Sequence, residues 1–228
     1  MATREQIAEL YIATFNRAAD ADGLSYWDGT GMPETGEKTS LTELEDIAEA
    51  LLDSPEVKAM YGDPSSESFD REAFIIKLYA NILNRTVDAT DDGVIYWVGS
   101  DISNAKMIIA LINGAKAETG DPVDRATLEN KLEVGLAFAD ADLNDVAFAI
   151  SIMEPVTNDD ATVISAKEEI DGMAPQVVGE TFTLTIGADT FTGTDADDTI
   201  NAYIATNSIN GNNQDTISNI DIIDGGAC

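Results

Sequence analysis

Histidine is absent from this sequence of 228 residues, cysteine occurs once, as Cys228, and 12 basic residues stand against 43 acidic ones. Without histidine, the chain alone cannot form a Ser-His-Asp or Cys-His catalytic arrangement or a zinc site that uses histidine. The formal net charge of −31 opposes binding to nucleic acid or to a bare anionic membrane. Divalent cations and neutral partners are therefore the expected counterparts, unless the acidity only keeps an abundant protein soluble.

Long apolar segments are also lacking. No run is long enough to span a bilayer, and the first residues lead into an amphipathic pattern without the apolar core of a signal peptide. We therefore expect no transmembrane segment and, for an extracellular protein, export without an N-terminal signal peptide. The near absence of cysteine fits a secreted protein that does not rely on disulfides, although a cytosolic protein can share it.

Helix start signals and apolar spacing extend over the first 172 residues. Thr3 with Gln6 forms a capping box ahead of a helix predicted over residues 4–18. Similar start signals, a polar cap or a proline in the first turn, recur downstream. They lie at Ser40 with Glu43, Ser54 with Pro55, Asp70, and Asp121 with Pro122. Later helices are predicted over 107–117, 122–138, 143–153 and 159–171, so this region should be all α.

An internal repeat organises the helical region. LYIATFNRAADADGLSYW, from Leu10 to Trp27, recurs as LYANILNRTVDATDDGVIYW, from Leu78 to Trp97. Both copies keep Leu-Tyr, Asn-Arg, Asp, Gly and Tyr-Trp in the same order. We expect repeat units of about 4–62 and 70–118, followed by helices to 172, with the apolar stripes of the two units packed together because either alone is too small to cover its surface.

The repeated residues have both structural and functional interpretations. Asn-Arg is predicted at a helix end, where a cation favours the carbonyl-rich terminus. Asp22 and Asp92 are predicted to cap the short helices that carry the Tyr-Trp pairs. Alternatively, exposed rings of these pairs stack on a sugar. The candidate glycan-binding residues are Tyr26, Trp27, Tyr96 and Trp97.

Composition changes near residue 172. Every basic residue lies at or before Lys167, and the rest of the chain is acidic, with short β-branched runs between Gly, Asn and Asp. Thr181 to Ile186 alternates with a period of two, which predicts a strand. The predicted fold class is α + β in separate domains. An all-α bundle of two repeats plus extra helices, 1–172, is followed by the beginning of an all-β domain of a calcium-binding type, 180–228.

Acidic turns in the second region predict calcium. Gly193 to Asp198 has the oxygen density that this ion requires. The surrounding segments resemble the calcium-linked β modules of surface-layer and RTX-related proteins, although the nonapeptide pattern G-G-x-G-x-D-x-U-x is only begun, at Gly225-Gly226. The open alternative is that Asp, Asn and Gly only form turns between strands. The candidate ligands are Asp195, Asp197, Asp198, Asp215 and Asp224.

The helical repeat itself resembles a known family. The Leu-Tyr…Asn-Arg…Asp…Gly…Tyr-Trp unit, over roughly residues 5–117, is similar to a small helical domain found in tandem in surface-layer proteins and type I-secreted adhesins. In Gram-negative surface layers, related N-terminal helical regions anchor the lattice to lipopolysaccharide. The resemblance implies a structural, non-enzymatic protein at the cell surface, with calcium as cofactor and lipopolysaccharide or another surface glycan and further copies of itself as partners.

Two other functions stay open at this point. The chain could be the N-terminal part of a type I-secreted, RTX-like adhesin whose helical repeats are spacers and whose activity lies outside this sequence. It could also be a glycoside hydrolase built on paired carboxylates, which the many Asp and Glu would permit. The sequence places no two of these carboxylates in a defined site.

Overall fold

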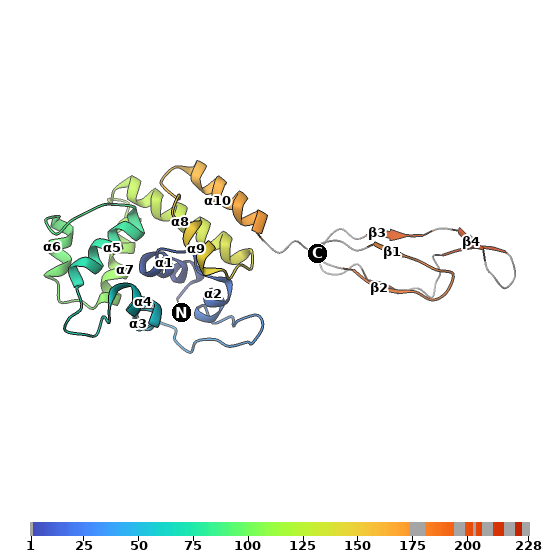
Figure 1. Ribbon diagram of the computed structural model, residues 1–228, viewed down its shortest axis with the longest axis horizontal. Coiled ribbons are helices and arrows are strands. Elements are labelled where there is room, and N and C mark those ends of the chain that lie inside the picture. The colour runs from blue at the N-terminus through green and yellow to red at the C-terminus, as the bar shows by residue number, and fades with distance from the viewer. Residues whose placement is uncertain are drawn as a thin grey trace. The chain divides into compact units, whose positions relative to one another are not determined.

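The computed structural model describes residues 2–173, 181–193, 199–202, 204–206, 212–216 and 222–224. Contacts divide the chain into two compact units, Met1–Ala174 and Pro175–Cys228. The N-terminal part is helical, as predicted (Figure 1). Its described helices are α1 (Arg4–Phe15), α2 (Ala21–Trp27), α3 (Leu44–Leu52), α4 (Pro55–Tyr61), α5 (Arg71–Leu83), α6 (Asp92–Val98), α7 (Asn104–Lys116), α8 (Pro122–Asp140), α9 (Val146–Ser151) and α10 (Asp160–Met173).

Helix α1 lies near the middle of the helical unit in Figure 1. Its capping box is present, since Gln6 N donates to Thr3 Oγ1 and Thr3 N donates to Gln6 Oε1. Residues 7–15 are all buried, because α1 contacts both α5 and α8, which also contact each other. The helix ends three residues before the predicted Ala18, since Asn16 takes a left-handed conformation with φ of 50°.

Several of the other helix starts follow the sequence signals. Ser54, Asp70 and Asp121 accept backbone hydrogen bonds as caps of α4, α5 and α8. The predicted start at Ser40 with Glu43 is wrong, because Glu43 precedes α3 without a side-chain cap. The chain before α3 is held extended there, since Ala2 N donates to the carbonyl of Thr42.

Two later helices differ from their predicted bounds. Helix α7 begins at Asn104, earlier than predicted, because the Ser103 side chain accepts a hydrogen bond from Lys106 N. Helix α9 is much shorter than the predicted 143–153. Leu143 lies in the connection before α9, where its carbonyl accepts a hydrogen bond from Ala21 N, and Asp145 caps the helix instead.

The two repeats share one hydrophobic core. A single cluster includes Leu10 and Ile47 from the first repeat and Leu78 and Ile108 from the second. Helix α1 contacts α5, and α3 contacts α7, so equivalent helices of the two repeats pack on each other. A second cluster of α8, α9 and α10 includes Phe138 and adjoins α1 through Ile12. The helical unit is therefore built on its internal repeat.

Polar side chains donate hydrogen bonds to backbone carbonyls at the C-terminal ends of α1 and α5. The Tyr61 hydroxyl donates to the carbonyl of Thr14 and Asn81 Nδ2 donates to that of Ala13, both at 2.9 Å. Lys131 Nζ from α8 donates to the Asn81 carbonyl at 2.6 Å. Each acceptor belongs to the last turn of a helix and lacks a partner within that helix. Buried polar groups thus fix how the repeats and α8 are joined.

The second unit contains short strands in its described residues. They are β1 (Thr181–Thr183), β2 (Thr190–Thr192), β3 (Thr199–Asn201), β4 (Ile204–Thr206), β5 (Asn213–Asp215) and β6 (Ile222–Asp224). Strands β1 and β3 pair in parallel, as do β2 and β6, whereas β4 and β5 are antiparallel. The strand predicted from Thr181 to Ile186 ends early, because Thr185 N and Oγ1 donate to the Asp189 carboxylate and form a turn.

A nine-residue period underlies these strands. β1, β2 and β3 begin nine residues apart, and the sequence repeats accordingly as TFTLTIGAD and TFTGTDADD. The Phe182 and Phe191 rings, one from each of the first two strands, stack with centroids 5.0 Å apart. β1 meets β3 in parallel and β2 belongs to a different pair, whereas the successive strands β4 and β5 pair with each other. The period of nine residues therefore extends to the strand starts, while the pairing does not alternate throughout the described residues.

Candidate functional site

The repeated motif forms the same local structure twice. Asp20 Oδ1 accepts a hydrogen bond from Gly23 N, and Asp91 Oδ1 accepts one from Gly93 N, so these two aspartates cap α2 and α6. The predicted caps, Asp22 and Asp92, lie within the first turn instead. The cap must precede the helix for its carboxylate to reach an N–H of the first turn, and Asp22 and Asp92 come too late in the chain for this.

The Tyr, Gly and Trp of each motif pack together. A Cβ at Gly23 would lie 2.4 Å from the Tyr11 hydroxyl oxygen, and one at Gly93 would lie 2.2 Å from that of Tyr79. Burial raises the pKa of Tyr11, and the nearby Trp27 indole, a hydrogen-bond donor, acts in the opposite direction. Burial likewise raises the pKa of Tyr79, with Trp97 in the same opposing role. Glycine is required where the hydroxyl approaches the short helix.

Replacing Gly93 with alanine is expected to lower the free energy of unfolding by about 1–3 kcal/mol, because the added methyl overlaps a buried tyrosine. Gly114 in α7 is the matched control, since a Cβ there meets nothing within 4 Å. Gly114→Ala should stabilise by about 0.5–1 kcal/mol through the higher helix propensity of alanine. Urea denaturation measures both. A Gly93→Ala protein as stable as the wild type would contradict the close packing.

The four aromatic candidates for glycan binding differ in exposure. Trp27 and Trp97 pack against the core in both repeats. Each meets the tyrosine before it edge-on, with ring centroids 4.9 Å apart. Tyr26 is half-buried, whereas Tyr96 is 66% exposed. The structure therefore places the two tryptophans equivalently and leaves Tyr96 as the ring most open to a ligand.

The Asn-Arg pair of the first repeat forms a closed ionic cluster. Asn16 ends α1, and the Arg17 side chain that follows is buried. Its Nε and Nη2 donate to the two oxygens of Glu56, both at 3.2 Å, and its Nη1 donates to Asp20 at 2.9 Å. The guanidinium also lies over the Tyr11 ring, 5.0 Å from its centroid. The predicted interaction with the helix end is thus replaced by carboxylate pairs.

The Asn-Arg pair of the second repeat, Asn84 and Arg85, is open, because its arginine makes fewer hydrogen bonds and stays partly exposed. Arg85 and Asp124 are the counterparts of Arg17 and Glu56, each 68 positions later, and both ion pairs span 39 residues. Aspartate is one methylene shorter than glutamate, and only Arg85 Nη1 donates to it, at 3.0 Å. Asp88, which lies 68 positions after Asp20 as Arg85 does after Arg17, accepts hydrogen bonds from Thr90 instead. The Arg85 side chain stays 47% exposed.

A cavity of about 380 Å³ opens beside this pair, and we name it the Arg85 cavity. It lies where the end of α5, the start of α8 and the loop before α10 meet. Its polar lining residues are Asn84, Arg85, Asp121, Asp124, Thr127, Thr157 and Asn158. None of these lining residues was predicted to form a site. One feature of the sequence could have indicated the pair: in each repeat an acidic residue follows the arginine of the motif by 39 residues, on a helix that begins with proline.

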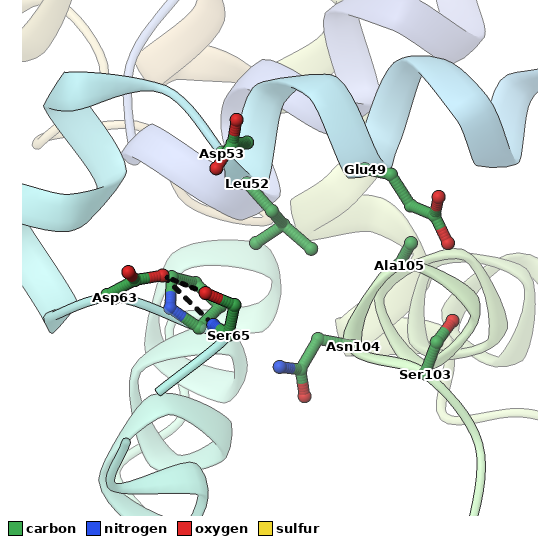
Figure 2. Close-up of a pocket in the computed structure, with 9 residues that line it drawn as sticks. Glu49, Leu52, Asp53, Asp63, Ser65, Ser103, Asn104 and Ala105 are labelled. Atoms are coloured by element: carbon green, nitrogen blue, oxygen red, sulfur yellow. Dashed lines mark hydrogen bonds between the residues drawn. The ribbon is translucent and has the colours of Figure 1, made fainter. Parts of the chain in front are cut away.

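A second cavity, of about 270 Å³, is acidic. Figure 2 shows Glu49 on α3, Asp53 directly after that helix, Asp63 and Ser65 after α4, and Ser103 to Ala105 at the start of α7. The Asp63 carboxylate is engaged by Ser65 N and Oγ, and Asp53 pairs with Lys58. Among the described residues, no three acids, His or Cys are grouped so as to hold a metal ion.

The calcium candidates lie in the second unit. Asp195, Asp197 and Asp198 lie outside the described residues. Asp215 ends β5, exposed and in register with Ile204. Asp224 ends β6, in register with Thr192, and its side chain is outside what the structure describes. Calcium binding by these residues stays a prediction.

Comparisons with known proteins leave the chain without a match. No family model, no curated protein and no solved structure matches it. None of the described helices is long and apolar enough to cross a membrane.

Proposed function

We propose that this chain acts as a structural surface-layer protein, not as an enzyme. Its helical unit anchors the lattice to lipopolysaccharide at the cell surface, and its β unit joins a calcium-dependent, self-assembling array. The observation that carries the proposal is that the first Tyr, the Asn, the Gly and the Trp of the repeat are used for internal packing in both copies. Tyr11 and Tyr79 meet the short helices, and Asn16 and Asn84 end α1 and α5 in the left-handed conformation. The motif is therefore architectural, as expected of a tandem scaffold.

Charge limits how such a scaffold binds an anionic glycolipid. A chain of net charge −31 and lipopolysaccharide repel each other at long range. Contact then depends on neutral sugars or on bridging calcium, and each site is weak. Avidity supplies the strength, because a lattice presents many copies and makes each further contact intramolecular. The nine-residue period of the strands supports the proposal that the β unit is a repetitive module. In modules of this kind, acidic turns between strands bind calcium.

The test is retention on immobilised lipopolysaccharide from the producing cell. Assembled protein in calcium is expected to be retained at least about 100-fold more strongly than monomer, because of multivalency. A chelator should abolish both assembly and tight retention. Lipopolysaccharide without O-antigen is the comparison surface. Equal, negligible retention of monomer and assembled protein on every surface would rule the anchor out.

A second candidate is a type I-secreted adhesin in which the helical repeats are spacers. The observation that favours it is the same nine-residue period, since a short-repeat solenoid also suits an extended secreted chain. Such a protein would bind a matrix or host glycan without forming a lattice. Electron microscopy at high protein concentration in calcium separates the two, because only the first candidate forms ordered arrays.

A further inference from the structure

The two repeats differ in how fully they use the arginine of the motif. In the first repeat every nitrogen of the Arg17 guanidinium donates to Glu56, Asp20 or the carbonyl of Ala18. In the second, within the described part of the chain, Arg85 makes one side-chain hydrogen bond, through Nη1, and Asp124 accepts it with Oδ2. Arg85 Nε and Nη2 and Asp124 Oδ1 therefore stay available beside the Arg85 cavity.

The walls of this cavity are fixed by side chains that hold main-chain groups. Asn84 Nδ2 donates to the Val156 carbonyl at 2.7 Å, which ties the end of α5 to the loop before α10. Asn130 Nδ2 donates to the Thr157 carbonyl at 2.9 Å, which ties the same loop to α8. Asp124 is only 8% exposed, so its carboxylate is held in one place. A site with fixed polar groups loses little conformational entropy on binding.

The lining chemistry selects a class of ligand. Arg85 carries one positive charge, while Asp121 and Asp124 carry two negative charges, so a phosphate or carboxylate is disfavoured. The apolar lining is limited to Leu83 and Val123, which is too little for a lipid chain. A guanidinium beside a carboxylate complements adjacent hydroxyl groups, since a hydroxyl can donate a hydrogen bond to the carboxylate and accept one from the guanidinium.

We propose that the Arg85 cavity binds one neutral sugar residue through a vicinal diol. Arg85 and Asp124 contact the two hydroxyls, and Asn158, whose side chain makes no hydrogen bond to the described residues, supplies a further amide. The volume of about 380 Å³ is near the lower end of the range for ligand sites, which fits a single ring. This inference rests on the proposed glycan anchor and places it in the second repeat, where the motif is open.

The experiment uses the polysaccharide released from lipopolysaccharide of the producing cell by mild acid, which removes the lipid. Binding to the 228-residue chain is measured by calorimetry and by amide shifts in NMR, with D-mannose, L-rhamnose and D-glucose as millimolar probes. Arg85→Ala and Asn158→Ala are each expected to weaken polysaccharide binding at least about tenfold, the loss typical of one or two hydrogen bonds to a sugar. Asp124→Asn, which keeps the shape but removes the charge, should weaken it similarly.

One control and one variant of a competing site accompany these substitutions. Lys167→Ala removes an exposed cation that pairs with Glu133 on α8 and does not line the cavity, so binding should be unchanged. Tyr96→Ala tests the competing site, the exposed aromatic ring on α6. Thermal unfolding verifies that each variant is folded.

Each result separates the cavity from the anchor. If the wild type binds the polysaccharide and the cavity variants bind equally well, the cavity assignment is overturned while the anchor stands. Retention of intact lipopolysaccharide without any binding of polysaccharide or monosaccharide would also overturn the cavity and leave anchoring through another part of the glycolipid. Loss of binding in Tyr96→Ala but not in Arg85→Ala would move the site to α6. If the wild type neither binds these sugars nor is retained on lipopolysaccharide, both proposals fail.

Discussion

Arg17→Ala is expected to lower the free energy of unfolding by about 3 kcal/mol, because it removes a buried cation from two carboxylates. The side chain of Asp20 is 19% exposed and that of Glu56 is 39% exposed, so water screens part of the charge that is left behind. Packing on the Tyr11 and Phe15 rings is also lost.

The matched variant in the second repeat is Arg85→Ala. This side chain is half-exposed and makes one ion pair, but its partner Asp124 is buried, so the loss should cost about 1–2 kcal/mol, less than at Arg17. Urea denaturation followed by fluorescence of Trp27 and Trp97 reports both variants. Arg17→Lys should fall between the wild type and Arg17→Ala, since an ammonium keeps the charge but not the two-pronged contact with Glu56. Equal losses at Arg17 and Arg85 would contradict the difference between the closed and open repeats.

Lys131→Met is expected to change how stability depends on pH. Lys131 is 2% exposed, and burial lowers its pKa from 10.5 to about 8. Because the unfolded chain binds this proton more tightly, the cost of the buried charge is complete below pH 8 and disappears as pH rises toward 10.5. The stability of Lys131→Met relative to the wild type should therefore decrease by about 2–3 kcal/mol between pH 7 and pH 10.

The difference in stability between the wild type and Lys131→Met reports the titration of Lys131 separately from that of the tyrosines. Burial raises the pKa values of Tyr61 and Tyr79, so both favour the folded state less above pH 10, but they do so in both proteins. Lys167→Met is the control for replacing a lysine by methionine, because its side chain is 47% exposed. Chemical denaturation at several pH values gives the measurement. A constant difference for Lys131→Met would mean that the amine has nearly the same pKa in the folded and the unfolded chain.

Helix starts could be predicted because they are local. Thr3, Ser54, Asp70 and Asp121 each bond to an N–H two or three residues ahead, so a short window contains both partners. Features that depend on residues distant in sequence were less predictable. The predicted cap at Ser40 fails because Ala2, distant in sequence, holds the segment before α3 extended.

Part of the candidate site was also present in the sequence. The repeat identified Arg17 and Arg85 as equivalent, and the constant separation of 39 residues would have identified Glu56 and Asp124 as their partners. The nine-residue period in TFTLTIGAD and TFTGTDADD was likewise readable without coordinates. The burial of Lys131 was not, because a lysine in the middle of an otherwise amphipathic helix gives no sign of which residues cover it.

The sequence by itself determined the helical repeat, its acidity and the absence of histidine chemistry, since these follow from residue identity and local spacing. Only the tertiary structure decided that one copy of the motif is closed and the other open. That outcome depends on the length of an acidic side chain that lies 39 residues after the arginine. Glu56 accepts hydrogen bonds from two nitrogens of the Arg17 guanidinium, whereas the shorter Asp124 accepts one from Arg85. A difference of one methylene between equivalent acids becomes a cavity only when α5, α8 and the loop before α10 are brought together.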